Sequence, residues 1–236
     1  MIKSVFLHIV FISFGMTVHA QTKWFHTYTD SAALVTDATE IVKKFKNDIN
    51  NIDTAIVVNP TVILNTQPFL IFYSPKSNKV NLPLWQQLSA ESKNFFITLS
   101  GSEKKGQELF GLFFNGFYLP HELGHALQKT LTRYKSTNSY ESEYLANILG
   151  MLWWRKQGKH KELKKCYKLA KKIMMQLKNP VPSGQTAEQY FTENYGEAGK
   201  NPFVYGYMQF GQFIKIYEDK SLTNFDTKIK ELSKQK

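Results

Sequence analysis

The pentapeptide His121-Glu122-Leu123-Gly124-His125 constrains this chain more than any other stretch. Two histidines four residues apart on a helix project from the same face, one turn apart, so both imidazoles can reach one metal ion. The glutamate after the first histidine can then lie beside a metal-bound water and act as a general base. With only six histidines in 236 residues, this pattern arises by accident in roughly one such chain per hundred. The pentapeptide therefore predicts a zinc site on a helix.

The residues before the motif predict that this helix is buried. Leucine and phenylalanine dominate residues 109–119, which run directly into the histidines. Pro120 has no N–H to donate to the preceding turn, so it either opens the motif helix at its first turn or kinks a longer helix at that point.

The first twenty residues have the pattern of a signal peptide. Lys3 gives a positive start, residues 5–16 form an apolar run, and Val18-His19-Ala20 supplies a small-x-small cleavage site before Gln21. The run is too short for a comfortable transmembrane helix, although an uncleaved anchor is the alternative. We therefore expect an exported protein of bacterial origin, periplasmic or secreted, with no stable membrane span after cleavage.

Residues 21–236 have the composition of one globular domain, with 42% hydrophobic and 21% charged residues. The only cysteine, Cys166, rules out a disulfide within the chain, so we expect it to be a packing residue. The net charge is +11, and removal of Lys3 with the signal peptide leaves +10. Nothing in the sequence resembles a nucleic-acid-binding module, and the lysine clusters are typical of the solvated faces of helices.

Periodicity and turn residues predict a mostly helical α+β fold. A small sheet is expected in residues 21–100, with strands at 55–64, 68–73 and 80–82 and a hairpin joining the last two. Residues 21–28 are an arm or a strand, and residues 95–99 are compatible with either strand or helix. Helices are expected at 31–50, 84–91, from 102 or 103 into the motif, and at 140–157, 159–177, 186–194, 203–217 and 222–233. Residues 103–157 would carry the metal helices and residues 159–236 a helical C-terminal part.

Residues that favour helix N-termini mark several of these starts. Asp30-Ser31, Ser102, Ser139, Thr186 and Asn201-Pro202 are the expected caps, and Gly158 is expected to end the helix that Ser139 begins.

A catalytic zinc ion normally takes a third protein ligand and keeps one position for water. Glu141 and Glu143 compete for this role, and positions two apart on a helix point to nearly opposite sides. The face of Glu143 continues through small or polar residues, whereas the face of Glu141 continues through leucine and isoleucine. Glu143 is therefore the expected third ligand, and Asn147, one turn later, can hydrogen-bond a histidine ligand and fix its ring.

The motif His121-Glu122-x-x-His125 followed by Glu143-x-x-Ala146-Asn147 resembles the gluzincin class of zinc metallopeptidases. The resemblance covers about thirty residues, and the preceding hairpin is a weaker similarity. It implies a zincin-like fold in which an edge strand holds the substrate and two helices hold the metal. It also implies that His121, His125 and Glu143 are zinc ligands, that Glu122 is the base, and that Asn147 supports a ligand.

The chemistry expected from this site is zinc-assisted hydrolysis of peptide bonds in a peptide or protein substrate. Glu122 would take a proton from the attacking water and pass it to the leaving amine. A further donor should stabilise the oxyanion, and Tyr195, Tyr205 and Tyr207 are candidates, although each is equally suited to packing.

Two other functions fit the sequence. The first is a non-catalytic exported binding protein on a zincin-like scaffold, which a degraded motif would favour, and this motif is intact. The second is a helical domain without zinc whose basic surface binds anionic polymers of the cell envelope. Metal content tests the second, which requires no zinc, whereas zinc in the binding protein would be structural or absent. The sequence leaves the natural substrate and the oligomeric state open.

Overall fold

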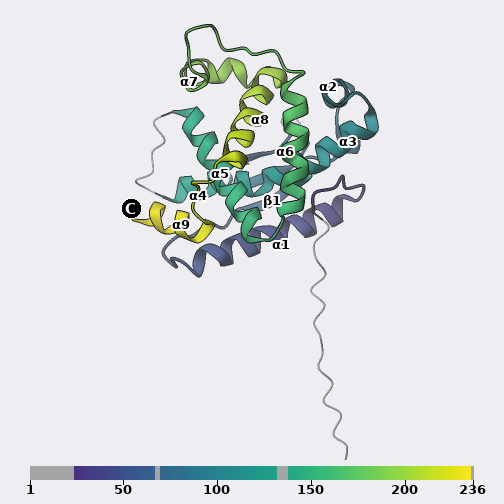
Figure 1. Cartoon of the computed structure of the whole chain (residues 1–236). Coiled ribbons are helices and arrows are strands. Elements are labelled where there is room, and N and C mark those ends of the chain that lie inside the picture. The colour runs from purple at the N-terminus through teal and green to yellow at the C-terminus, as the bar shows by residue number, and fades with distance from the viewer. Residues whose placement is uncertain (1–23, 67–69, 132–137, 235–236) are drawn as a thin grey trace, which may run out of the picture.

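The computed structural model describes residues 24–66, 70–131 and 138–234 (Figure 1). In chain order its elements are α1 (Ser31–Asn50), β1 (Thr61–Leu64), β2 (Phe72–Ser74), β3 (Lys79–Leu82), the 3₁₀ turn η1 (Trp85–Gln87), α2 (Ala90–Ser100), α3 (Glu103–Leu112), the π-helical turn η2 (Phe113–Phe117), α4 (Tyr118–Thr130), α5 (Ser139–Lys156), α6 (His160–Met174), α7 (Ala187–Ala198), α8 (Pro202–Glu218) and α9 (Phe225–Ser233). The fold is mostly helical α+β with a small sheet before the motif helix, as predicted. The predicted signal peptide, residues 1–20, lies outside the described residues. Within the three described ranges, no helix is long and apolar enough to span a bilayer.

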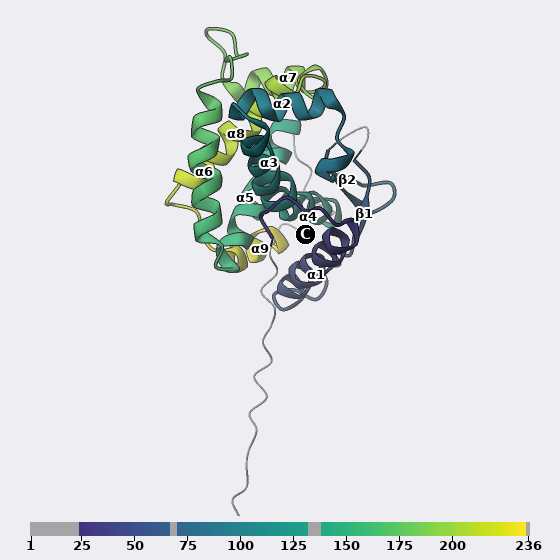
Figure 2. The ribbon, with the colours of Figure 1, turned by 90° about the vertical axis from the view of Figure 1, so that its right-hand side faces the viewer.

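The sheet has the strand order β1–β3–β2. β2 and β3 form the predicted antiparallel hairpin, and β1 pairs with β3 in parallel, with Val62 opposite Val80. Only the end of the strand predicted for residues 55–64 forms a strand. β2 is an outer strand of this sheet and lies in contact with α4. Figure 2 shows β1 and β2 on one side of the molecule and α6 on the other.

Most of the predicted helix starts are confirmed. The side chains of four predicted N-caps accept a backbone N–H from the first turn of the helix: Asp30, Ser102, Thr186 and Asn201. The prediction for α5 is wrong by one residue, because its cap is Asn138 rather than Ser139. Asn138 has extended backbone angles, and its Oδ1 accepts the N–H of Glu141 at 2.8 Å, which leaves Ser139 as the first helical residue.

Residues 95–99, whose pattern is compatible with either a strand or a helix, are helical. They belong to α2, which Ser89 caps and Gly101 ends with a φ of 85°. The helix predicted for residues 84–91 is reduced to η1, because this cap at Ser89 starts a new helix. Phe96 and Leu99 face the core from α2.

Pro120 lies in the first turn of α4, and α4 continues a longer helical run that is kinked at Asn115, so each of the two predicted alternatives holds in part. α3, η2 and α4 follow one another without a break, and Asn115 within η2 departs from helical angles. Because Pro120 has no N–H, the carbonyl of Gly116 lacks its usual helical donor. The indole N–H of Trp24 donates to that carbonyl at 2.8 Å. Trp24, in the segment before α1, therefore supplies the hydrogen bond to Gly116 that Pro120 cannot make.

α4 and α5 pack backbone to backbone at two glycines. A Cβ added to Gly124 would lie 3.1 Å from the Cα of Ala146, and one added to Gly150 would lie 3.1 Å from the backbone nitrogen of His121. These distances are shorter than ordinary van der Waals contact. The small residues on the Glu143 face of α5 thus permit the close approach that the sequence predicted.

The core surrounds this helix pair with aromatic side chains. Phe113 and Phe117 meet Phe213 of α8 at ring-centroid distances of 5.4 Å and 4.7 Å. Cys166 on α6 is fully buried, as expected of a packing residue. Buried side chains thus enclose the helix pair.

We expect Gly124→Ala to destabilise the fold even though alanine is the better helix former. The added methyl group would meet the α5 backbone, which cannot rotate away, so the free energy of unfolding should fall by about 1–3 kcal/mol. Gly196→Ala on α7 is the matched control, because no heavy atom lies within 4 Å of its added Cβ, and it should gain about 0.5–1 kcal/mol. Urea denaturation measures both, and equal stability of the two variants would contradict the close packing.

Candidate metal centre

His121 and His125 converge on one point from successive turns of α4. Their Nε2 atoms lie 3.2 Å apart, and the two rings are nearly perpendicular at 85°. His121 is 3% exposed, whereas His125 is partly open to the pocket. His121, Glu122 and His125 each offer a ligand atom within 4.8 Å of the others. These three residues form a cluster that could hold a metal ion.

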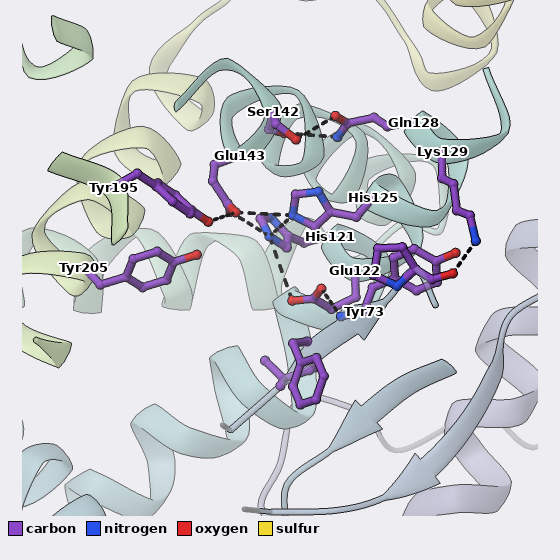
Figure 3. Close-up of a pocket in the computed structure, with 13 residues that line it drawn as sticks. Tyr73, His121, Glu122, His125, Gln128, Lys129, Ser142, Glu143, Tyr195 and Tyr205 are labelled. Carbon is purple, nitrogen blue, oxygen red and sulfur yellow. Dashed lines mark hydrogen bonds and ion pairs between the residues drawn. The ribbon is translucent and has the colours of Figure 1, made fainter. Parts of the chain in front are cut away.

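Glu143 reaches the same point from α5 and lies closer to the histidines than Glu122 does. Its Oε2 is 3.2 Å from the Nε2 of His121, and its Oε1 is 3.5 Å from the Nε2 of His125. Glu122 Oε1 is 4.0 Å from the Nε2 of His121. Glu141 stands in the first turn of α5 and does not line the pocket. Figure 3 shows the Glu143 carboxylate directed at both rings.

Glu122 is held by the sheet rather than by the histidines. Its Oε2 accepts the backbone N–H of Tyr73 on β2 at 2.7 Å. This bond leaves Oε1 as the oxygen directed towards His121 (Figure 3). The edge strand therefore fixes the Glu122 carboxylate beside the convergent donor atoms.

A buried hydrogen-bond chain determines which ring nitrogen of His121 is free. An ionised Glu143 can only accept, so the Gln209 Nε2 donates to its Oε2 at 2.7 Å and the Gln209 Oε1 must accept. That Oε1 accepts the Nδ2 of Asn147 at 2.9 Å. The Asn147 Oδ1 then faces the Nδ1 of His121 at 2.9 Å, so Nδ1 carries the proton. The Nε2 of His121 is left with a lone pair for a ligand.

Gln212 independently fixes the same orientation of the Asn147 amide. Its Nε2 donates to the backbone carbonyl of Tyr140 at 3.2 Å, so its Oε1 must be an acceptor. That Oε1 accepts the Nδ2 of Asn147 at 2.8 Å. Asn147 is fully buried and is oriented by two glutamines of α8. The predicted contact of Asn147 with a histidine is thus present, and it is with His121.

Burial and opposite charge act differently on the two glutamates. Burial raises the pKa of Glu143, but the facing rings of His125 and His121 outweigh it and hold that pKa well below its ordinary value. Burial lowers the pKa of His125, but the Glu143 carboxylate outweighs it and raises that pKa to about 9. Burial raises the pKa of Glu122. Glu143 is therefore a paired anion, and Glu122 is the stronger proton acceptor of the two.

The cluster opens into a pocket of about 460 Å³ between α4, α5, β2 and the α7–α8 region. Two of the three candidate tyrosines, Tyr195 and Tyr205, line it, and Tyr207 does not. The Tyr195 hydroxyl donates to Glu143 Oε1 at 2.7 Å. The structure thus brings two phenol groups, one of them bonded to Glu143, to the wall of the site (Figure 3).

Comparisons with protein-family models, curated proteins and solved structures found no match to this chain. The chemistry of the site is therefore inferred from the geometry of its own residues.

Sequence reasoning missed the contribution of α8 and of the β2 backbone. Gln209 and Gln212 stand three residues apart in an aromatic helix, on a face that also carries Phe213 and Ile216. Amide side chains on a core-facing stripe require buried partners, so this pattern was a usable signal. The bond from the Tyr73 N–H to Glu122 had no signal in the sequence, because any residue except proline offers that donor.

Gln209→Met should weaken metal binding without removing a ligand. Methionine fills similar space but cannot hold Glu143 or Asn147, and loss of such a supporting contact typically costs about 10–100-fold in metal affinity. Competition with a chelator measures the affinity, and the exposed Gln176→Met is the matched control. Unchanged affinity in a folded Gln209→Met protein would contradict the role of the hydrogen-bond chain.

Proposed function

We propose that this protein is a zinc-dependent metallopeptidase that hydrolyses peptide bonds. One observation carries the proposal: His121, His125 and Glu143 converge on a common point while the Glu122 carboxylate stands beside them on a separate support. The first three residues would be the zinc ligands, Glu122 would be the general base, and Asn147 would support His121. Two neutral imidazoles and one carboxylate are a donor set of known catalytic zinc sites.

The distances are compatible with a tetrahedral ion such as zinc. Donor atoms at the corners of a tetrahedron with metal–ligand bonds of about 2.0–2.1 Å are about 3.3–3.4 Å apart. The two Nε2 atoms are separated by 3.2 Å, and the nearest Glu143 oxygens lie 3.2 Å and 3.5 Å from them. His121, His125 and Glu143 line the same pocket as Tyr195 and Tyr205, so an ion that they held would be open to it. The residues therefore fit a tetrahedral ion that keeps one position for water.

Zinc bound here would supply a Lewis acid that lowers the pKa of water and polarises a carbonyl group. The chain's own residues would do the rest. Glu122 Oε1, which the Tyr73 bond leaves directed at the site, would accept the proton of the attacking water and deliver it to the leaving amine nitrogen.

The substrate class follows from the strand beside the site. Ile71, Phe72 and Tyr73 line the pocket, and β2 is the outer strand next to β3. An extended peptide could lie along such an edge through main-chain hydrogen bonds other than the one that the Tyr73 N–H makes to Glu122. This arrangement favours a peptide or protein substrate over a compact small molecule.

Replacing the proposed base tests the activity. Glu122→Gln keeps the size of the side chain and removes its ability to take a proton, so zinc content should stay at the wild-type level while hydrolysis of a peptide library falls by at least about 10²-fold. His121→Ala should lose the metal itself. Wild-type hydrolysis by Glu122→Gln would reject Glu122 as the base. A zinc-loaded wild type that cleaves no peptide would favour the binding-protein alternative.

Replacing the third ligand tests the site. Glu143→Ala removes the α5 carboxylate and should sharply lower the zinc content measured by elemental analysis. Glu141→Ala is the matched control, because the same change two residues earlier leaves the His121–His125–Glu143 cluster in place. Zinc retained by Glu143→Ala but lost by Glu141→Ala would reverse the assignment.

A further inference from the structure

One face of α6 carries a stripe of lysines that the metal centre does not use. At 100° per residue these lysines fall within a sector of about 120° along the helix. All are exposed: Lys161, Lys164, Lys165, Lys168, Lys171 and Lys172. The opposite face packs into the core through Leu163, Cys166, Ala170 and Ile173. We call the exposed face the lysine stripe.

The lysine stripe is almost free of neutralising partners. Within the described ranges, Lys171 alone among the six forms an ion pair, with Glu218 at 3.7 Å. The acidic residue of α6 itself, Glu162, is half-buried and lies outside the sector. Like charges at this density repel one another, so the stripe favours an anionic partner.

The C-terminal end of the stripe adds exposed apolar side chains beside the exposed Lys178. Met175 falls in the same sector, directly after α6, and is 76% exposed. A hollow of about 480 Å³ lies beside the next residues of the chain, and Leu177, Phe203 and Val204 help to line it. Phe203 is 41% exposed. Two of the three large apolar side chains exposed in the described residues therefore lie at this end.

The stripe also lies away from the site. α6 forms one outer edge of the molecule, and β2, which borders the pocket, lies on the opposite side (Figure 2). A flat partner that covered α6 would leave the β2 side uncovered.

We propose that the lysine stripe, with Met175 and Phe203 at its end, docks the protein on an anionic lipid bilayer. The lysines would contact the headgroups, and the two apolar side chains would enter the boundary between headgroups and acyl chains. Met175, exposed in the same sector as the lysines, distinguishes a lipid surface from a soluble polyanion, which would gain nothing from it. This inference does not depend on the proposed peptidase activity.

Vesicle sedimentation tests the proposal with the chain from Gln21 onward, which retains every buried side chain of the described core. We expect binding to vesicles of phosphatidylcholine mixed with phosphatidylglycerol and little binding to phosphatidylcholine alone. One lysine near such a surface contributes about fivefold in affinity, so Lys165→Glu with Lys168→Glu should weaken binding by about 30-fold or more. Lys43→Glu with Lys44→Glu on α1 is the control, because it changes the net charge equally at exposed positions.

A second variant separates lipid from a soluble polyanion. Met175→Gln should weaken vesicle binding but leave binding to inorganic polyphosphate unchanged. The proposal is overturned if wild-type protein does not bind the anionic vesicles, or if the α1 pair weakens binding as much as the α6 pair. It is also overturned if Met175→Gln binds vesicles like wild type. Zinc content and peptide hydrolysis of the α6 pair should equal wild type, since α6 does not line the pocket.

Discussion

The close packing of α4 against α5 is the contact on which the candidate site depends. The two histidines share one helix, but Glu143 belongs to another, and it meets them only because Gly124 and Gly150 let the two backbones touch. A packed core does not absorb an extra methyl group without displacement. A shift of a few tenths of an ångström would be large on the scale of metal–ligand distances. The geometry of the site therefore depends directly on the spacing between α4 and α5.

Buried polar groups are the second constraint, because each must find a partner inside the core. Glu143 is 5% exposed, and it is matched by two imidazoles, the amide of Gln209 and the hydroxyl of Tyr195. An unpaired carboxylate at this depth would cost several kcal/mol, roughly the stability of a small domain. The glutamines of α8 are explained by this requirement, since apolar residues would pack there equally well.

Much of the local structure could be predicted from the sequence because it depends on neighbours along the chain. The caps at Asp30, Ser102 and Thr186, the hairpin at β2–β3 and the amphipathic α6 all follow from spacing and residue type. The predictions that missed were those where two local patterns compete. Asn138 and Ser139 can both cap a helix, and the backbone angles of the preceding loop decide between them.

For the site, the sequence by itself determined the donor residues: two histidines one turn apart, a glutamate between them, and Glu143 on the small-residue face of a second helix. It also determined the charge of α6. Only the tertiary structure decided that Gln209 orients Asn147 and thereby sets the tautomer of His121, and that the Tyr73 backbone holds Glu122. These contacts join residues that are 26 to 66 positions apart in the chain. A sequence pattern does not show how one helix is aligned against another. Side-chain periodicity shows which face a residue is on, whereas packing alone determines what that face meets.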